Sequence, residues 1–214
     1  MMSAPFTPRI RKACDMLWIR HGETDDNVAH RIQGRSETSL NANGRQQVER
    51  LAEHLSVQGS CALWCSPMKR AVETAQILAS RLSIAQAQVF DGVVEIELGR
   101  FVGRRLPELA KDPDWQNYLS RPYGARFPGG ESFEELSMRV KAACQYILEH
   151  ENADTILVVS HGGVMACLLS QLMGIDEQAY HRLRIANAHA IALRFQPPER
   201  VRLLGVNVQS IGQQ

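Results

Sequence analysis

Short apolar runs alternate with amphipathic stretches along most of the 214-residue chain. Three of these runs, at residues 16–19, 61–65 and 155–159, have the length and composition of buried strands. Each run leads into a polar loop and then a helix-like stretch, as in a sheet whose strands are connected by covering helices. The pattern therefore predicts an α/β protein with a mostly parallel sheet.

Two amphipathic helices are predicted after the first two strands. Residues 44–55 place Val48 and Leu51 on one face and charged side chains on the other, which is the spacing of a helix with one buried side. After the second strand, Ser66 has the side chain of an N-cap residue, and Pro67 suits the first position of a helix. Both helices would cover the predicted sheet.

Two further helices are predicted on either side of the third strand. Ser132 and Glu135 have the S-x-x-E spacing of a capping box and precede an apolar stretch with helical periodicity. Residues 164–173 are apolar on nearly all sides and end before Gly174, a residue type that commonly terminates helices. A helix without a polar face is expected to be buried between layers.

Residues 100–130 interrupt this regular pattern. They contain four prolines, and we expect them to form a cap or lid. The later apolar segments 191–195 and 201–206 are expected to be antiparallel strands. Residues 1–14 form an irregular N-terminal segment. No internal repeat or linker divides the chain, which predicts a single domain over residues 1–214.

The composition indicates which kinds of molecule the protein is expected to bind and which it is not. Hydrophobic residues make up 44% of the chain, enough for a full core. The 24 basic and 23 acidic residues nearly balance, so the chain lacks the basic surplus with which proteins bind nucleic acids or anionic membranes. Its five cysteines are odd in number, and no apolar run suits a signal peptide or membrane span. We therefore expect a cytoplasmic protein without a nucleic-acid or membrane partner.

Candidate catalytic side chains follow each of the three predicted strands. Arg20 and His21 follow the first, Arg70 lies in the helix after the second, and His161 follows the third. The carboxyl ends of parallel strands meet at one edge of a sheet, so these side chains are expected to face one crevice. Gly22 would let backbone N–H groups approach an anion. This cationic pocket, with no ring of carboxylates, suits a phosphoryl group better than a metal ion.

Five short motifs follow one another at the predicted strand ends and helix starts. They are Arg20-His21-Gly22-Glu23-Thr24-x-x-Asn27, Ser66-Pro67-x-x-Arg70-Ala71-x-x-Thr74, Glu95-Ile96-x-Leu98-Gly99, Pro128-Gly129-Gly130-Glu131-Ser132 and Ser160-His161-Gly162. In this order and spacing, the chain resembles the histidine phosphatase superfamily, and in particular its phosphatase branch with alpha-ribazole phosphatase and broad-specificity phosphatases. The resemblance implies the phosphoglycerate-mutase-like fold, a three-layer α/β/α sandwich.

The resemblance also implies a role for each candidate residue. His21 would attack phosphorus in line and become phosphohistidine. Arg20, Arg70 and His161 would bind the equatorial oxygens of the phosphoryl group. Glu95 would protonate the leaving oxygen and then activate water. Positions that match substrate or phosphate contacts of the family are Gly22, Thr24, Asn27, Gln33 and Gly34. No cofactor and no metal ligand is implied.

A second carboxylate lies close to the predicted acid. Glu97 is two residues beyond Glu95 and would share its face of an extended strand. The family places its glutamate four residues before a glycine, which favours Glu95 because Gly99 follows at that spacing. The family's Trp-Glu-Gly after this glycine is replaced here by Phe-Val-Gly at residues 101–103.

Three functions stay open. A metal-independent phosphatase of the histidine acid type lets water take the phosphoryl group, a mutase returns it to the substrate, and a non-catalytic module only binds phosphate. The family's cofactor-dependent mutases carry an insertion and an extended tail, so the short stretch 103–127 and the end soon after Val206 favour the phosphatase. The nucleophile and the acid argue against a module.

The substrate is expected to be a small phosphorylated metabolite whose identity the sequence does not give. Five basic residues of the cap region could select a second anionic group or could simply be solvated: Arg104, Arg105, Lys111, Arg121 and Arg126. The sequence does not determine the oligomeric state, and a homodimer stays open.

Overall fold

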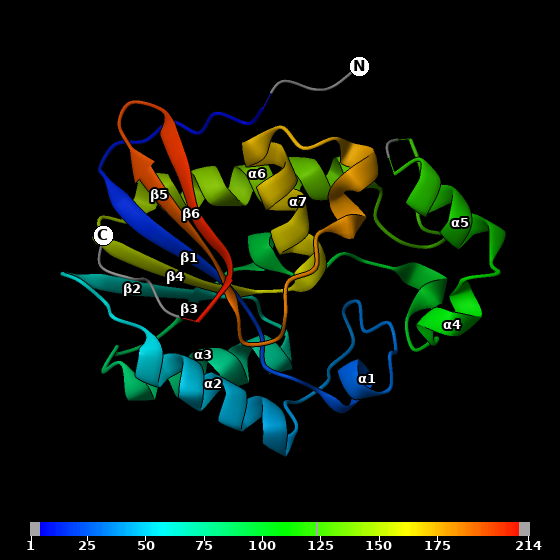
Figure 1. Ribbon diagram of the computed structural model, residues 1–214, viewed down its shortest axis with the longest axis horizontal. Helices are drawn as coiled ribbons and strands as arrows, with labels where there is room; N and C mark the ends of the chain where they lie inside the picture. The colour runs from blue at the N-terminus through cyan, green and yellow to red at the C-terminus, as the bar shows by residue number, and fades with distance from the viewer. Residues whose placement is uncertain (1–4, 123, 210–214) are drawn as a thin grey trace.

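The computed structural model describes residues 5–122 and 124–209. Over these residues, a single six-stranded sheet has the order β3-β2-β4-β1-β5-β6 (Figure 1). The strands are β1 (Cys14–Arg20), β2 (Cys61–Cys65), β3 (Gln88–Val89), β4 (Thr155–Ser160), β5 (Ala190–Gln196) and β6 (Arg200–Val208). The first four strands pair in parallel, whereas β5 pairs antiparallel with β1 and β6 antiparallel with β5. The predicted sheet and its late antiparallel strands are confirmed.

Helices cover both faces of this sheet. Figure 1 shows α2 and α3 on one face and α6 and α7 on the other. The longer helices are α2 (Ala42–His54), α3 (Lys69–Arg81), α6 (Phe133–His150) and α7 (Gly162–Met173). Shorter ones are α1 (Asp25–Val28), η1 (Asp91–Val93), η2 (Gly99–Phe101), α4 (Leu106–Leu109), α5 (Pro113–Ser120) and η3 (Glu177–Arg182). The predicted three-layer α/β/α sandwich is confirmed.

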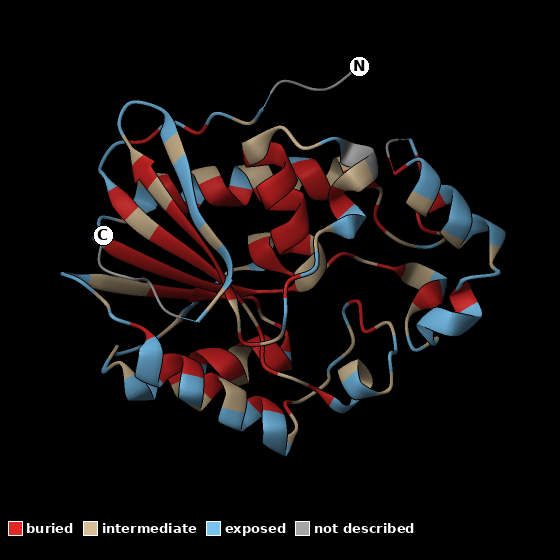
Figure 2. Ribbon diagram, in the orientation of Figure 1, coloured by how far each residue is buried: buried red, intermediate tan, exposed pale blue. Residues whose placement is uncertain are grey.

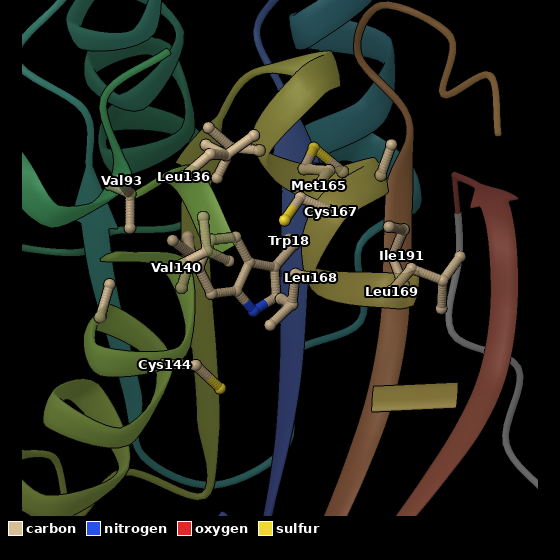
Figure 3. Close-up of a cluster of buried hydrophobic side chains, with 14 of the residues drawn as sticks. Trp18, Val93, Leu136, Val140, Cys144, Met165, Cys167, Leu168, Leu169 and Ile191 are labelled. Carbon is tan, nitrogen blue, oxygen red and sulfur yellow. The ribbon is translucent and has the colours of Figure 1, made fainter. Parts of the chain in front are cut away.

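The central strands are apolar throughout because both of their faces are buried. Alternate residues of β1 enter different cores: Leu17 packs with α2 and α3, and Trp18 packs with α6 and α7. Figure 3 shows Trp18 between Val140 of α6 and Leu168 of α7. All six residues of β4 are buried, and the strands form the red centre of Figure 2. Such continuous apolar runs are typical of parallel strands covered on both sides.

Two helix ends agree with the sequence prediction, and a third does not. Ser132 and Glu135 form the predicted capping box of α6, and α7 ends at Gly174, which has a φ of 63°. Ser66 and Pro67, however, do not open α3, which begins at Lys69 with Met68 as its N-cap. The Ser66 hydroxyl is instead used by a buried histidine, described below.

The cap region packs into the core beside α6 and α7. It contains α4 and α5 and runs to the right of the sheet in Figure 1. Phe101, Trp115 and Phe127 form a cluster of aromatic rings whose centroids lie 5.4–5.8 Å apart. Tyr118 of α5 shares a buried hydrogen bond with the Tyr180 hydroxyl of η3. Movement of this region as a lid stays a prediction, as does the division of the chain into a core and a cap.

No disulfide bond is formed by the cysteines, all of which lie in the described ranges: Cys14, Cys61, Cys65, Cys144 and Cys167. Across the described ranges, no helix has both the length and the apolar character required to cross a bilayer.

Candidate active site

Two buried histidines lie side by side where β1 and β4 end. The parallel register sets Arg20 opposite Ser160, so the residues that follow, His21 and His161, are neighbours. The His21 amide donates to the Ser160 carbonyl at 3.1 Å, and the two imidazole centroids are 5.2 Å apart. Both side chains are buried. The prediction that these strand ends bring their side chains together is therefore confirmed for the histidines, and a crevice at this place stays a prediction.

The hydrogen bonds of His21 determine which ring nitrogen is free to attack. Nδ1 lies 2.8 Å from the Gly22 carbonyl, which can only accept, so Nδ1 carries the proton. The lone pair of the neutral ring is therefore on Nε2. Burial, followed by the charges of Arg70 and Arg20, lowers the pKa of His21 well below its usual value of 6.5. The ring is thus held in the neutral form that a nucleophile requires.

Arg70 brings a guanidinium to the same nitrogen. Its Nε lies 3.2 Å from Nε2 of His21, although Arg70 belongs to α3, which follows β2 and not β1. The loop between α1 and α2 fixes this side chain, since Nη2 donates to the Gly34 carbonyl at 2.7 Å and Nη1 to the Ser36 carbonyl at 2.8 Å. The guanidinium is thus buried and oriented before any substrate arrives.

Two further nitrogens at the site have no hydrogen-bond partner among the described residues. Arg20 donates from Nη1 to the Ile185 carbonyl at 2.6 Å, but its buried Nε has no partner there. His161 shares a 2.7 Å hydrogen bond with the Ser66 hydroxyl through Nε2, which leaves its buried Nδ1 without a partner. Buried polar groups are rarely left unpaired, so these nitrogens point to an anionic ligand with several acceptor oxygens.

Glu95 and Glu97 have different neighbours, although they are two residues apart in one loop. A Cβ built on Gly163, at the start of α7, would lie 2.9 Å from Oε1 of Glu95, so this carboxylate lies against the helix that follows His161. Glu97 instead accepts from the Gly99 amide at 3.3 Å and forms an ion pair with Arg35 at 3.7 Å. The expectation of a shared strand face is wrong, because residues 94–98 belong to no strand or helix.

A model of the Histidine phosphatase superfamily (branch 1) matches residues 16–209. The chain belongs to this superfamily. "Probable phosphoglycerate mutase GpmB" from Salmonella paratyphi C is 35% identical over 181 residues, which cover 83% of each chain. The alpha-ribazole phosphatase of Shigella flexneri has a TM-score of 0.81 at 26% identity and covers 94% of this chain and 99% of that one. A phosphoserine phosphatase variant from Entamoeba histolytica, in complex with phosphoserine, has a TM-score of 0.78 at 26% identity and covers 92% and 98%.

The family resemblance carried by the five motifs is thereby confirmed. The predicted substrate contacts make hydrogen bonds within the protein. Thr24 and Asn27 form the capping box of α1, and the Gln33 side chain accepts from the Thr38 hydroxyl at 2.6 Å. Gly34 supplies the carbonyl that Arg70 binds. Direct contacts of these side chains with a phosphate stay predictions.

Gly22 has a steric reason to be glycine. A Cβ at this position would lie 2.6 Å from the carbonyl oxygen of Gly44 in α2, which is closer than side chains tolerate. Its amide donates to the Thr74 hydroxyl at 3.1 Å. The amide is therefore used within the protein, and its predicted contact with a phosphate stays a prediction.

The sequence did not predict the hydrogen bonds that two residues make at the site. Ser66 belongs to one of the five motifs, but its N-cap interpretation concealed the bond to His161. Asn187 precedes β5 and donates to the His21 carbonyl at 3.0 Å. Asn187 belongs to none of the motifs, and only the antiparallel pairing of β5 with β1 brings it to this loop.

The basic residues of the cap divide into two groups. Arg104 binds Asp112 at 2.9 Å, and Arg126 is paired with Glu135, so acidic neighbours offset both charges. The other three side chains are exposed: Arg105, Lys111 and Arg121. Across residues 5–122 and 124–209, no group of three or more His, Cys, Asp and Glu side chains is arranged to hold a metal ion.

The buried histidines make a prediction about protonation. The pKa of His161 is also lowered well below 6.5, first by burial and then by nearby cations, so both rings should take up a proton only at unusually low pH. We expect their NMR signals to keep the shifts of neutral imidazole as pH falls from about 8 to about 6 in phosphate-free buffer. Spectra of His21→Asn and His161→Asn assign the signals, and an added histidine peptide should titrate near pH 6.5. A midpoint at or above that of the peptide contradicts the prediction.

Proposed function

We propose that this protein is a phosphomonoesterase that hydrolyses a small phosphorylated metabolite through a phosphohistidine at His21. One observation carries the proposal. The unprotonated Nε2 of the neutral, buried His21 lies 3.2 Å from the Arg70 guanidinium, and the adjacent Arg20 and His161 each have a buried nitrogen with no partner among the described residues. A nucleophile that carries no charge, surrounded by donors, suits a phosphate dianion, which repels an anionic nucleophile.

The first half of the reaction transfers the phosphoryl group to the protein. Nε2 of His21 forms a bond to phosphorus while the bond from phosphorus to the leaving oxygen breaks. Arg20, Arg70 and His161 stabilise the charge on the equatorial oxygens, and Arg70 exchanges its contact with Nε2 for one with the phosphoryl group. Glu95 supplies the proton that the leaving oxygen takes up, so the product departs as an alcohol.

The second half returns the protein to its starting state. Glu95, now a carboxylate, removes a proton from water as the water oxygen attacks phosphorus. The bond from phosphorus to Nε2 breaks, inorganic phosphate forms, and Glu95 is again protonated for the next turnover. The same side chain thus serves as acid and then as base, which requires one carboxylate close to both the leaving group and the incoming water.

A screen for phosphate release tests the proposal. The panel comprises alpha-ribazole phosphate, phosphoserine, phosphoglycerates and sugar phosphates, because relatives with the same fold are named for two of these substrates. We expect stoichiometric release of inorganic phosphate from at least one of them. A protein that binds these compounds without releasing phosphate would be a phosphate-binding module.

Phosphoglycerate mutase activity is the second candidate, and the 35% identity to the Salmonella relative favours it. A mutase must shield phosphohistidine from water and return the group to a second hydroxyl. Incubation with 3-phosphoglycerate separates the two activities. A phosphatase produces one inorganic phosphate for each substrate consumed, whereas a mutase produces 2-phosphoglycerate with almost no phosphate release.

We further propose that catalysis needs no metal ion, because arginine and histidine donors already supply the positive charge around the reacting group. Phosphate release is expected to persist in excess chelator and to be blocked by vanadate, which adopts the trigonal-bipyramidal geometry of the transition state. Assays with and without EDTA, and with increasing vanadate, measure both effects. Activity that is lost in EDTA and restored by a divalent metal would refute the metal-free mechanism.

A further inference from the structure

A partly buried ion pair lies behind the segment that carries Glu95. Arg139 of α6 donates from Nε and Nη2 to the two carboxylate oxygens of Glu131, both at 2.9 Å. Their side chains are only 20% and 10% exposed. Bidentate pairs of this kind fix both partners in orientation as well as in distance. The pair is therefore a rigid feature of the fold and not a flexible surface contact.

The guanidinium of Arg139 also binds the backbone just before the acid. Its Nη1 donates to the carbonyls of Gly92 at 3.0 Å and Val94 at 2.8 Å. Val94 directly precedes Glu95 in the chain. The Arg139 side chain thus donates two hydrogen bonds to the backbone just before Glu95, while its other two nitrogens bind Glu131.

Glu131 binds the same segment on the other side of the acid. Its amide donates to the Glu97 carbonyl at 2.8 Å, and its Oε2 accepts from the Glu97 amide at 3.3 Å. Arg35 adds a contact from Nε to the Glu95 carbonyl at 3.0 Å and another from Nη2 to Oε2 of Glu131 at 3.4 Å. The backbone is therefore held before, at and after Glu95.

This segment depends on side-chain partners because it has no strand ladder. Residues 94–98 lie between η1 and η2 and belong to no sheet, so their backbone groups must be bonded by other means. Apolar packing holds several of its side chains: Val93 faces Leu136 and Val140 of α6 (Figure 3), and Ile96 and Leu98 belong to the same buried core. The polar contacts of Arg139 and Glu131 supply hydrogen bonds to the backbone between these apolar side chains.

We propose that Glu131 and Arg139 are positioning residues that hold the Glu95 carboxyl group where it can exchange a proton with the leaving oxygen and with water. The inference rests on the proposed function. It also gives a structural role to the glutamate of the Pro-Gly-Gly-Glu-Ser motif and to an arginine that lies outside all five motifs. Neither side chain needs to touch the substrate.

The test uses the full-length protein with Arg139→Gln and Glu131→Gln, assayed on one alkyl and one aryl phosphate. Displacement of the acid should slow the departure of an alkoxide, which is a poor leaving group and needs a proton. An aryl oxide departs without a proton donor. A displacement of about 1 Å can cost about 10²-fold, so we expect turnover of the alkyl phosphate to fall about 10- to 100-fold. The burst of aryl alcohol that accompanies formation of phosphohistidine should change less than about threefold, with KM nearly constant.

The double variant tests whether the two residues act as one unit. Arg139→Gln combined with Glu131→Gln should be no slower on the alkyl phosphate than the worse single variant, because either change already breaks the pair. Arg139→Lys should not rescue turnover, because one ammonium cannot reproduce the bidentate pair together with both carbonyl contacts. This milder variant also keeps the test decisive if Arg139→Gln does not fold, a point that thermal unfolding checks.

Arg194→Gln is the matched control. Arg194 forms a bidentate pair with Asp15 at 2.7 and 2.9 Å, but this pair joins the amino end of β1 to β5, away from the histidines. This variant should keep the alkyl-to-aryl ratio of the unaltered protein. In folded Arg139 and Glu131 variants, equal losses from both substrates in the rate at which phosphohistidine forms, or no loss from either, would overturn the positioning role. If the unaltered protein releases phosphate from no substrate, the proposed function fails instead.

Discussion

Replacing His21 with alanine is expected to abolish phosphate release and to leave no phosphoryl group on the protein. Nε2 of His21 carries no proton, because Nδ1 faces the Gly22 carbonyl, and it lies 3.2 Å from Nε of Arg70. Loss of a nucleophile that no neighbour can replace should lower turnover by roughly 10⁴-fold or more. Rapid acid-free quenching after mixing with labelled substrate should trap the label on the unaltered protein as an acid-labile, base-stable adduct.

His54→Ala provides the control for this experiment. His54 lies at the exposed end of α2, where Nδ1 bonds the Arg50 carbonyl, and it has no contact with the site. This variant should acquire the label at the same rate and to the same extent as the unaltered protein. Label that maps to a serine, aspartate or cysteine, or label that persists in His21→Ala, would refute the phosphohistidine.

The strands and the histidine pair could be predicted because local signals determine them. A parallel strand buried on both faces must be apolar throughout, and β1, β2 and β4 are recognisable for that reason. Their carboxyl ends then bring His21 and His161 together without further information. The capping box of α6 is equally local, since Ser132 and Glu135 bond each other's backbone within one turn.

The remaining features depend on contacts between distant parts of the chain. Ser66 has a good N-cap side chain, but its hydroxyl bonds His161, which is 95 residues away. The hydroxyl also accepts from the Met68 amide at 3.3 Å, but α3 begins only at Lys69. Strand periodicity cannot separate Glu95 from Glu97, because their segment belongs to no strand and is bonded by Arg139 and Glu131. Spacing within a motif favours Glu95 as the acid, which stays a prediction.

The charges around His21 explain why the site is both stable and reactive. A buried cation normally needs a nearby anion, and Glu95 is the leading opposing charge felt by Arg20 and Arg70, whose pKa values burial lowers. A negative charge at this position therefore opposes part of the charge of the two arginines.

Glu95→Gln should slow turnover of alkyl phosphates by about 10²–10⁴-fold, the range for loss of a positioned acid. The substitution keeps the shape of the side chain and removes its proton. Transfer of the phosphoryl group from an aryl phosphate to His21 should be spared, because an aryl oxide leaves without a proton donor. Hydrolysis of the phosphohistidine should still slow, since the same carboxylate activates water. Stopped-flow assays should therefore show a burst of aryl alcohol.

Glu97→Gln provides the matched comparison two residues away. Its carboxylate binds Arg35 and the Gly99 amide on the other side of the loop, so neither step should change by as much as about tenfold. The two variants differ in position but not in chemistry, which removes any general effect of a lost charge from the comparison. If Glu97→Gln produced the burst and Glu95→Gln did not, Glu97 would be the acid, and the contacts that place Glu95 against Gly163 would have no catalytic consequence.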